Sequence, residues 1–166
     1  VGFGTGLNAL TTFNETEKSN LNIEFTSLEA YPLEWDEVSK LEYMSMEGYQ
    51  QYVTPFEKMH TCEWDDFTEI TANFSLRKLN LKLQEVSFEN TFDIIYFDAF
   101  APQIQPELWT EEIFTLMYKA LKKNGVLVTY CAKGIVKRAL KKVGFELQSI
   151  PGPPGKREMS RAVKNN

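Results

Sequence analysis

The sequence is poor in the residues that build disulfide frameworks and metal clusters. Its 166 residues include 2 Cys and 1 His. Cys62 and Cys131 match no metal-ligand spacing and are too few for a disulfide framework, so we expect no metal site and a reducing, cytoplasmic environment. Nothing near His60 in the sequence indicates a catalytic dyad, and we interpret this single histidine as structural.

Long hydrophobic runs are also missing. The longest, such as residues 94–97 and 126–128, have the length of a strand and fall far short of the roughly 18 residues of a membrane helix, so we expect no membrane span. With 43% hydrophobic residues, no repeat and no linker, residues 1–166 are predicted to form a single folded domain. The sequence begins at Val1 inside a motif, so we expect that N-terminal residues are missing.

Positive charge is scarce in the first part of the chain. Residues 1–118 contain 6 Lys and Arg against 21 Asp and Glu, whereas residues 119–166 contain 12 against 2. Such asymmetry indicates an anionic partner, for example a nucleic acid, for the basic part. Solvated helix faces explain the same residues and are the simpler reading of charge alone, so charge permits an RNA partner without requiring one.

Strand-like and helix-like segments alternate, which predicts an α/β fold with a mostly parallel sheet and helices on both faces. The expected strands are residues 23–28, 79–83, 92–97 and 126–131. The third of these is nearly all apolar, as in a central strand buried on both faces. Two further strands, 145–150 and 158–163, flank a Pro/Gly turn and predict an antiparallel hairpin at the C-terminal end.

Helices are expected between these strands. Pro106 suits a first helical turn, and apolar residues at helical spacing extend the helix to Lys123, before Asn124-Gly125. A second helix is predicted over 134–143, with Gly144 as its end. The aromatic-rich residues 47–74 are interpreted as helical.

A glycine-rich turn opens the chain. Gly2, Gly4 and Gly6 follow the spacing G-x-G-x-G before a helical run, and glycines in such a turn let the backbone approach a ligand closely. Dinucleotide sites carry G-x-G-x-x-G, which disfavours a nicotinamide oxidoreductase. The shorter spacing resembles the loop of class I S-adenosylmethionine-dependent methyltransferases. Glu29, at the end of the next strand, is placed to accept both ribose hydroxyls of such a cofactor, although an ordinary tight turn remains the alternative for the glycines alone.

Asp98 directly follows the apolar segment 92–97. Ligands of open α/β sheets bind at the carboxyl ends of the strands, so Asp98 is a candidate site residue. A carboxylate there can accept a hydrogen bond or a proton from an amine that is about to be methylated. We therefore predict Asp98 as a catalytic residue.

Several segments together resemble the MnmC-type transfer-RNA methyltransferase family, whose fold is the Rossmann-like class I methyltransferase fold. They cover nearly the whole chain: residues 1–8, 27–33, 97–102, 105–110, 130–138 and 151–159. In some bacteria the family's domain is fused to a flavin-dependent oxidase. This chain is too short to carry that domain, so it resembles the stand-alone, MnmD-like form.

The resemblance implies methylation of the 5-aminomethyl group of (2-thio)uridine at the wobble position of tRNA, with S-adenosylmethionine as cofactor and the anticodon stem-loop as partner. It implies catalytic roles for Asp98 and Phe100, with Phe100 stacking on the uracil, although a core aromatic is an equally good reading of Phe100. The implied cofactor contacts are Gly2, Phe3, Gly4, Gly6, Asn8, Glu29, Glu85 and Asp98, with Glu85 beside the adenine. The implied RNA contacts are Lys133, Arg138, Lys156 and Arg157.

Two alternatives stay open from the sequence. A methyltransferase for a small-molecule or protein amine would keep the cofactor, and the acidic first part of the chain would attract a cationic substrate. A binding module without chemistry would keep the fold alone, but the intact glycines, Glu29 and Asp98 argue against it.

Overall fold

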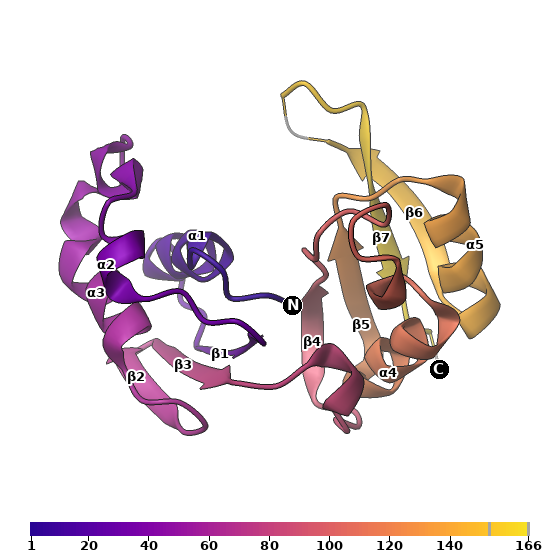
Figure 1. The fold of residues 1–166 in the computed structure, drawn as a ribbon, viewed down its shortest axis with the longest axis horizontal. Helices are drawn as coiled ribbons and strands as arrows, with labels where there is room; N and C mark the ends of the chain where they lie inside the picture. Colours follow the sequence, from indigo (N-terminus) through magenta and orange to yellow (C-terminus); the bar gives the residue numbers. More distant parts are fainter. Residues whose placement is uncertain (153, 166) are drawn as a thin grey trace. The chain divides into compact units, whose positions relative to one another are not determined.

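The computed structural model describes residues 1–152 and 154–165. The chain forms two compact units: Gly2–Lys82 is one, and the residues from Leu83 onward together with Val1 form the other. In Figure 1 the first unit runs from indigo to magenta and the second from pink to yellow. Each unit combines one sheet with helices.

The first unit is built on a three-stranded sheet of order β1-β3-β2. Strands β1 (Ile23–Leu28) and β3 (Phe74–Leu79) are parallel, and β2 (Phe67–Thr71) is antiparallel to β3. The helical segments are α1 (Leu7–Glu17), α2 (Trp35–Val38), the 3₁₀ turns η1 (Glu42–Ser45) and η2 (Gln50–Tyr52), and α3 (Val53–Thr61).

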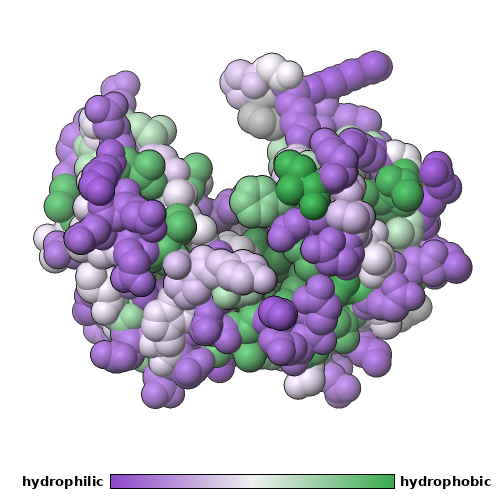
Figure 2. Space-filling model, in the orientation of Figure 1, coloured by the Kyte–Doolittle hydropathy of each residue, from purple (hydrophilic) through white to green (hydrophobic). Residues whose placement is uncertain are grey.

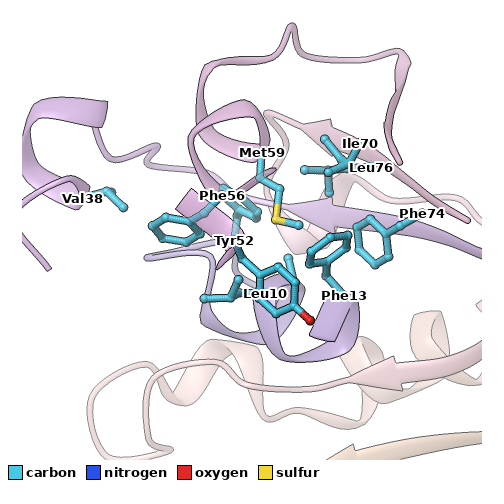
Figure 3. Packing of buried hydrophobic residues seen from close by; sticks show 11 residues of the cluster. Leu10, Phe13, Val38, Tyr52, Phe56, Met59, Ile70, Phe74 and Leu76 are labelled. Carbon is cyan, nitrogen blue, oxygen red and sulfur yellow. The ribbon is translucent and has the colours of Figure 1, made fainter. Parts of the chain in front are cut away.

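Aromatic and aliphatic side chains from helix α1, helix α3 and the sheet form the core of this unit (Figure 3). Phe13 of α1 lies edge-on to Phe74 of β3, with 5.5 Å between ring centroids, and edge-on to Tyr52 at 5.0 Å. Met59 and Leu76 are completely buried beside them. This packing fixes α1, and with it the glycine turn that precedes the helix.

The second unit holds a four-stranded sheet of order β4-β5-β7-β6. Strands β4 (Phe92–Tyr96) and β5 (Leu121–Thr129) are parallel, whereas β7 (Glu158–Val163) pairs antiparallel with β5 and with β6 (Glu146–Pro151). Helices α4 (Glu111–Ala120) and α5 (Gly134–Val143) pack against each other and on this sheet. The remaining elements are the 3₁₀ turns η3 (Leu83–Glu85) and η4 (Pro106–Leu108).

The ends of α4 and α5 follow from local residues. The Thr110 side chain accepts a hydrogen bond from the Ile113 amide at 3.4 Å and caps the start of α4. Gly144, with φ 116°, takes the left-handed conformation that ends α5, and its amide donates to carbonyls of the last helical turn.

The predicted alternation of strands and helices and the antiparallel C-terminal hairpin are confirmed. Strand 23–28, strand 158–163 and helix 134–143 were predicted with the bounds that the structure has. Among the described residues, however, the sheets are mixed, because the ladders β2–β3, β5–β7 and β6–β7 are antiparallel.

Several predicted boundaries are wrong. The strand expected at 79–83 is instead β3, which ends at Leu79, and β2 lies inside the segment interpreted as helical, of which α3 is the main helical part. Helix α4 begins at Glu111 because Pro106 starts a separate 3₁₀ turn, and it ends at Ala120, so Lys123 follows the helix.

Within the four-stranded sheet, strand β4 does not have the central position that its apolar sequence predicted. It occupies an edge of the four-stranded sheet, and Ile94 is 51% exposed. The prediction of a single domain over residues 1–166 stays a prediction. In the part of the chain that the structure describes, none of the helices has the length and apolar character needed to cross a membrane.

Candidate functional site

The glycine turn directly precedes α1 in the sequence, and in space it lies beside the end of β1 in the first unit. The Gly2 amide donates to the Leu28 carbonyl at 3.0 Å, and the Gly6 amide donates to the Phe3 carbonyl at 2.9 Å. Gly4 has φ 51°, and a Cβ placed on it would meet no atom within 4 Å. The backbone at Gly4 is therefore open on the side where a side chain would otherwise stand, as close approach of a ligand requires.

Glu29 follows β1 directly, as the sequence predicts, and its carboxylate is held by two backbone amides. Oε2 accepts from the Gly4 amide at 2.9 Å and Oε1 accepts from the Tyr31 amide at 2.9 Å. A carboxylate offers about four lone-pair positions, so two hydroxyl donors can still be accepted. The pair formed by Glu29 and the open Gly4 backbone fits the ribose and methionine portions of S-adenosylmethionine.

Beneath the turn lies a cluster that sequence reasoning missed. The His60 ring, from the last turn of α3, is 4.9 Å from the Phe3 ring centroid and 4.8 Å from that of Phe56. Lys78 of β3 is 1% exposed and donates from Nζ to the His60 carbonyl at 2.6 Å. Burial lowers the pKa of Lys78, and the neighbouring Cys62 and Glu63 oppose that shift.

The segment after β4 carries the other predicted site residues and is anchored through its backbone carbonyls. Tyr130 Oη donates to the Ala99 carbonyl at 2.9 Å, and Trp109 Nε1 donates to the Phe100 carbonyl at 2.8 Å. Burial, then the charges of Cys131 and Asp98, raise the pKa of Tyr130, so its hydroxyl stays a donor at neutral pH. These anchors hold Asp98 at a defined place beyond the strand.

Phe100 and Ile104 lie at the surface of this segment, 67% and 66% exposed. Figure 2 shows hydrophobic surface among hydrophilic residues over the part of the second unit where the chain continues from β4. The alternative of a core aromatic is therefore wrong for Phe100, whereas Phe97 and Trp109 are the buried aromatics, with ring centroids 5.1 Å apart. An exposed ring on an anchored segment is suited to stack on a planar ligand.

Two of the four predicted RNA contacts adjoin the same segment. Lys133 precedes α5 and donates to the side chain of Gln103, and the Lys156 ammonium lies 4.2 Å from the centroid of the Tyr130 ring. Arg138 and Arg157 are exposed, on α5 and directly before β7. Lys133 thus contacts this segment through Gln103, and Lys156 contacts Tyr130, which anchors the segment at Ala99.

The other two predicted cofactor contacts are Asn8 and Glu85. Asn8 lies in the first turn of α1, next to the glycine turn. Glu85 is exposed in η3, six residues beyond the end of β3 (85 minus 79), so its assignment to the adenine stays a prediction. Among residues 1–152 and 154–165, no group of His, Cys, Asp and Glu is suited to hold a metal ion.

Comparison with known protein families identifies the class of enzyme. A family model described as S-adenosyl-L-methionine-dependent methyltransferase matches residues 39–165. The chain belongs to this family. S-adenosylmethionine is therefore the cofactor, and the fit of Gly4 and Glu29 to this group agrees with that assignment.

The curated relatives are larger proteins. The chain is 29% identical over 98% of its length to the tRNA 5-methylaminomethyl-2-thiouridine biosynthesis bifunctional protein MnmC of Hahella chejuensis. It is 31% identical over 96% of its length to the protein of the same name in Leptospira interrogans. It spans 27% and 26% of these two relatives, about a quarter of each.

Solved structures confirm the Rossmann-like class I methyltransferase fold. MnmC2 from Aquifex aeolicus superimposes with a TM-score of 0.72 at 25% identity, over 97% of this chain and 50% of that one. The methyltransferase SibL in its apo form gives a TM-score of 0.57 at 9% identity, over 99% of this chain and 49% of that one, and shows the fold alone.

Proposed function

We propose that this protein methylates the 5-aminomethyl group of (2-thio)uridine at the wobble position of tRNA, giving the 5-methylaminomethyl product. The observation that carries the proposal is the anchored segment after β4, which bears a carboxylate, an exposed aromatic ring and two adjoining lysines. These groups match an amine, a base and a phosphate backbone. The MnmC name of the relatives supports the same substrate.

The glycine turn and Glu29 would bind the cofactor and orient it. When bound, S-adenosylmethionine supplies a methyl group on a positively charged sulfur. Glu29 would accept the ribose hydroxyls, while the open backbone at Gly4 lies against the cofactor. Both groups are held by hydrogen bonds within the first unit, so little ordering is needed on binding.

On the substrate side, Asp98 acts on the amine. An alkylamine is mostly protonated at neutral pH and must lose a proton before its nitrogen can attack. The Asp98 carboxylate would accept an N–H hydrogen bond, align the nitrogen lone pair, and pass the proton to water. After the amine is methylated, the Asp98 carboxylate would accept its second proton and pass it to water as well.

Phe100 and the basic residues would bind the RNA. The exposed Phe100 ring is suited to stack on the uracil, an interaction worth about 1–3 kcal/mol per base. Lys133 and Lys156 adjoin the same segment, where they would meet phosphates on either side of the wobble nucleotide, and Arg138 and Arg157 would extend this contact.

The test is transfer of tritiated methyl groups from S-adenosylmethionine to bulk tRNA of two origins. One tRNA pool comes from a strain that makes the 5-aminomethyl group but lacks its methylation, and the other from a strain that never makes the 5-aminomethyl group. We expect incorporation into the first pool only. Equal incorporation into both pools would contradict the proposal, and methylation of small amines or proteins without tRNA would favour the alternative substrate class.

A further inference from the structure

His60 occupies the space directly under the glycine turn. A Cβ placed on Gly6 would lie 2.6 Å from His60 Nε2, 3.2 Å from its Cε1 and 3.3 Å from Cε2 of Phe56. An approach under 3.0 Å requires a side chain to move. The imidazole has little freedom to do so, because Phe3, Phe56 and Trp35 surround it with ring centroids 4.9, 4.8 and 5.7 Å away.

The backbone of His60 is fixed as well. Its carbonyl accepts the 2.6 Å hydrogen bond from the Lys78 ammonium, which also lies 5.7 Å from the Phe3 ring centroid and 4.8 Å from that of Trp64. A buried lysine thus ties the end of α3 to β3 beneath Phe3. The imidazole is held both through its ring and through its main chain.

Burying the imidazole nitrogen costs free energy that an apolar side chain of the same shape would not cost. Nε2 is buried and makes no hydrogen bond of good geometry among the residues that the structure describes, although the Thr5 backbone lies near enough to act on the ring. A buried polar atom without a partner is rare, and it calls for an explanation at each place where it occurs. Burial, then the positive charge of Lys78, lowers the pKa of His60 to about 4 against a smaller opposing effect of the Thr5 backbone, so the ring is neutral at physiological pH.

We propose that His60 is a positioning residue for S-adenosylmethionine: its ring supports Phe3 and Gly6 from below and thereby fixes the turn whose Gly4 amide holds Glu29. The inference rests on the assignment of the glycine turn and Glu29 to the cofactor. It explains why residue 6 is glycine, since a side chain there would collide with the imidazole in addition to adopting φ 76°.

The experiment measures the dissociation constant of S-adenosylmethionine by calorimetry for the variants His60→Ala, Gly6→Ala and the two combined. Ile70→Ala is the matched control, because Ile70 is buried in the same core but belongs to β2. Thermal unfolding of each variant without cofactor measures the loss of stability separately. We expect His60→Ala to weaken cofactor binding roughly tenfold, and Ile70→Ala to lose stability with little change in binding.

The double variant tests the route of action. If the imidazole acts through residue 6, removing it makes room for the alanine, and the double variant binds the cofactor no more weakly than Gly6→Ala alone. Two results would overturn the proposal. One is a loss of cofactor affinity in the double variant that equals the product of the two single losses. The other is a loss of cofactor affinity in His60→Ala that is no greater than the loss in Ile70→Ala. Glu29→Gln separates the two assignments: a normal affinity in that variant refutes the cofactor site itself, whatever His60 does.

Discussion

Glu29 is prepared for its ligand by the backbone around it. Its two carboxylate oxygens accept from the amides of Gly4 and Tyr31, and its own carbonyl accepts from the Asn80 side chain at 2.9 Å. The side chain therefore needs no rearrangement before it accepts hydroxyl groups. At the residue scale, the proposed cofactor site consists of a fixed acid and an open glycine rather than of flexible side chains.

His60, the single histidine of the sequence, makes the free energy of unfolding depend on pH between about 4 and 6.5. Its pKa is about 4 in the folded protein and about 6.5 when unfolded, so the unfolded chain binds more protons between these values. Stability from this group is present above pH 6.5 and is lost as pH falls towards 4. Because the ring is partly exposed, we expect a loss of about 1–2 kcal/mol.

Urea unfolding at pH 7 and pH 4.5 measures this loss, with His60→Gln as the reference that lacks a titrating ring. Wild type should lose more stability between the two pH values than His60→Gln does. An equal loss in both proteins would show that His60 is not buried as described.

The segment between β4 and η4 is the element that carries the proposed substrate site. Its carbonyls at Ala99 and Phe100 are bonded to Tyr130 and Trp109, and the Ala101 carbonyl accepts from the Ile104 amide at 2.7 Å. Three consecutive bonded carbonyls give the segment one conformation. Asp98 and Phe100 are therefore presented by a rigid turn at the end of the strand.

Tyr130→Phe removes one of these anchors without changing the ring. We expect a loss of stability of about 0.5–1.5 kcal/mol, and a kcat for tRNA methylation that falls while the affinity for S-adenosylmethionine is unchanged. Steady-state kinetics and calorimetry measure the two effects. Tyr118→Phe, which removes a hydroxyl from another tyrosine of the second unit, should leave kcat unchanged. A normal kcat in Tyr130→Phe would contradict the role of this anchor.

The lysines that adjoin the segment predict a salt dependence. Removing a lysine that binds one phosphate should lower the slope of log affinity against log salt concentration by about 1. We expect Lys133→Ala and Lys156→Ala each to weaken tRNA binding in this way. Lys122→Ala is the control, because Lys122 already pairs with Asp93 at 2.8 Å. Slopes that match wild type in both test variants would place the RNA elsewhere.

The elements predicted correctly are those whose ends carry a local signal. Helix α5 has an apolar stripe and stops at Gly144, and β7 follows a Pro/Gly turn. Strand β3 was missed because charged residues interrupt it, and the buried ammonium of Lys78 is accommodated by the His60 carbonyl and by the Phe3 and Trp64 rings. Strand β5 begins earlier than predicted because Leu121 pairs with Phe92; the pairing with β4 is then interrupted over residues 122–125, where Asn124 has φ 64°, and resumes at Val126.

At the scale of the whole molecule, the proposed cofactor-binding and substrate-binding acids could be predicted from the sequence, but the residues that hold the neighbouring segments in place could not. Glu29 and Asp98 follow β1 and the strand-end residue Phe97, as a rule for parallel strands predicts. His60, Lys78 and Tyr130 were not found, because their roles depend on contacts with residues far along the chain. That Gly4 and Asp98 serve one methyl transfer stays a prediction.

The most direct test of this prediction is a single-turnover assay with saturating S-adenosylmethionine and saturating tRNA that carries the 5-aminomethyl group, followed by digestion to nucleosides. Wild type should yield the 5-methylaminomethyl nucleoside, and Asp98→Asn should lower the rate about 100-fold or more while binding the cofactor normally. Glu29→Gln should instead weaken cofactor binding. An Asp98→Asn enzyme with the full rate, or methyl label in any other nucleoside, would contradict the account.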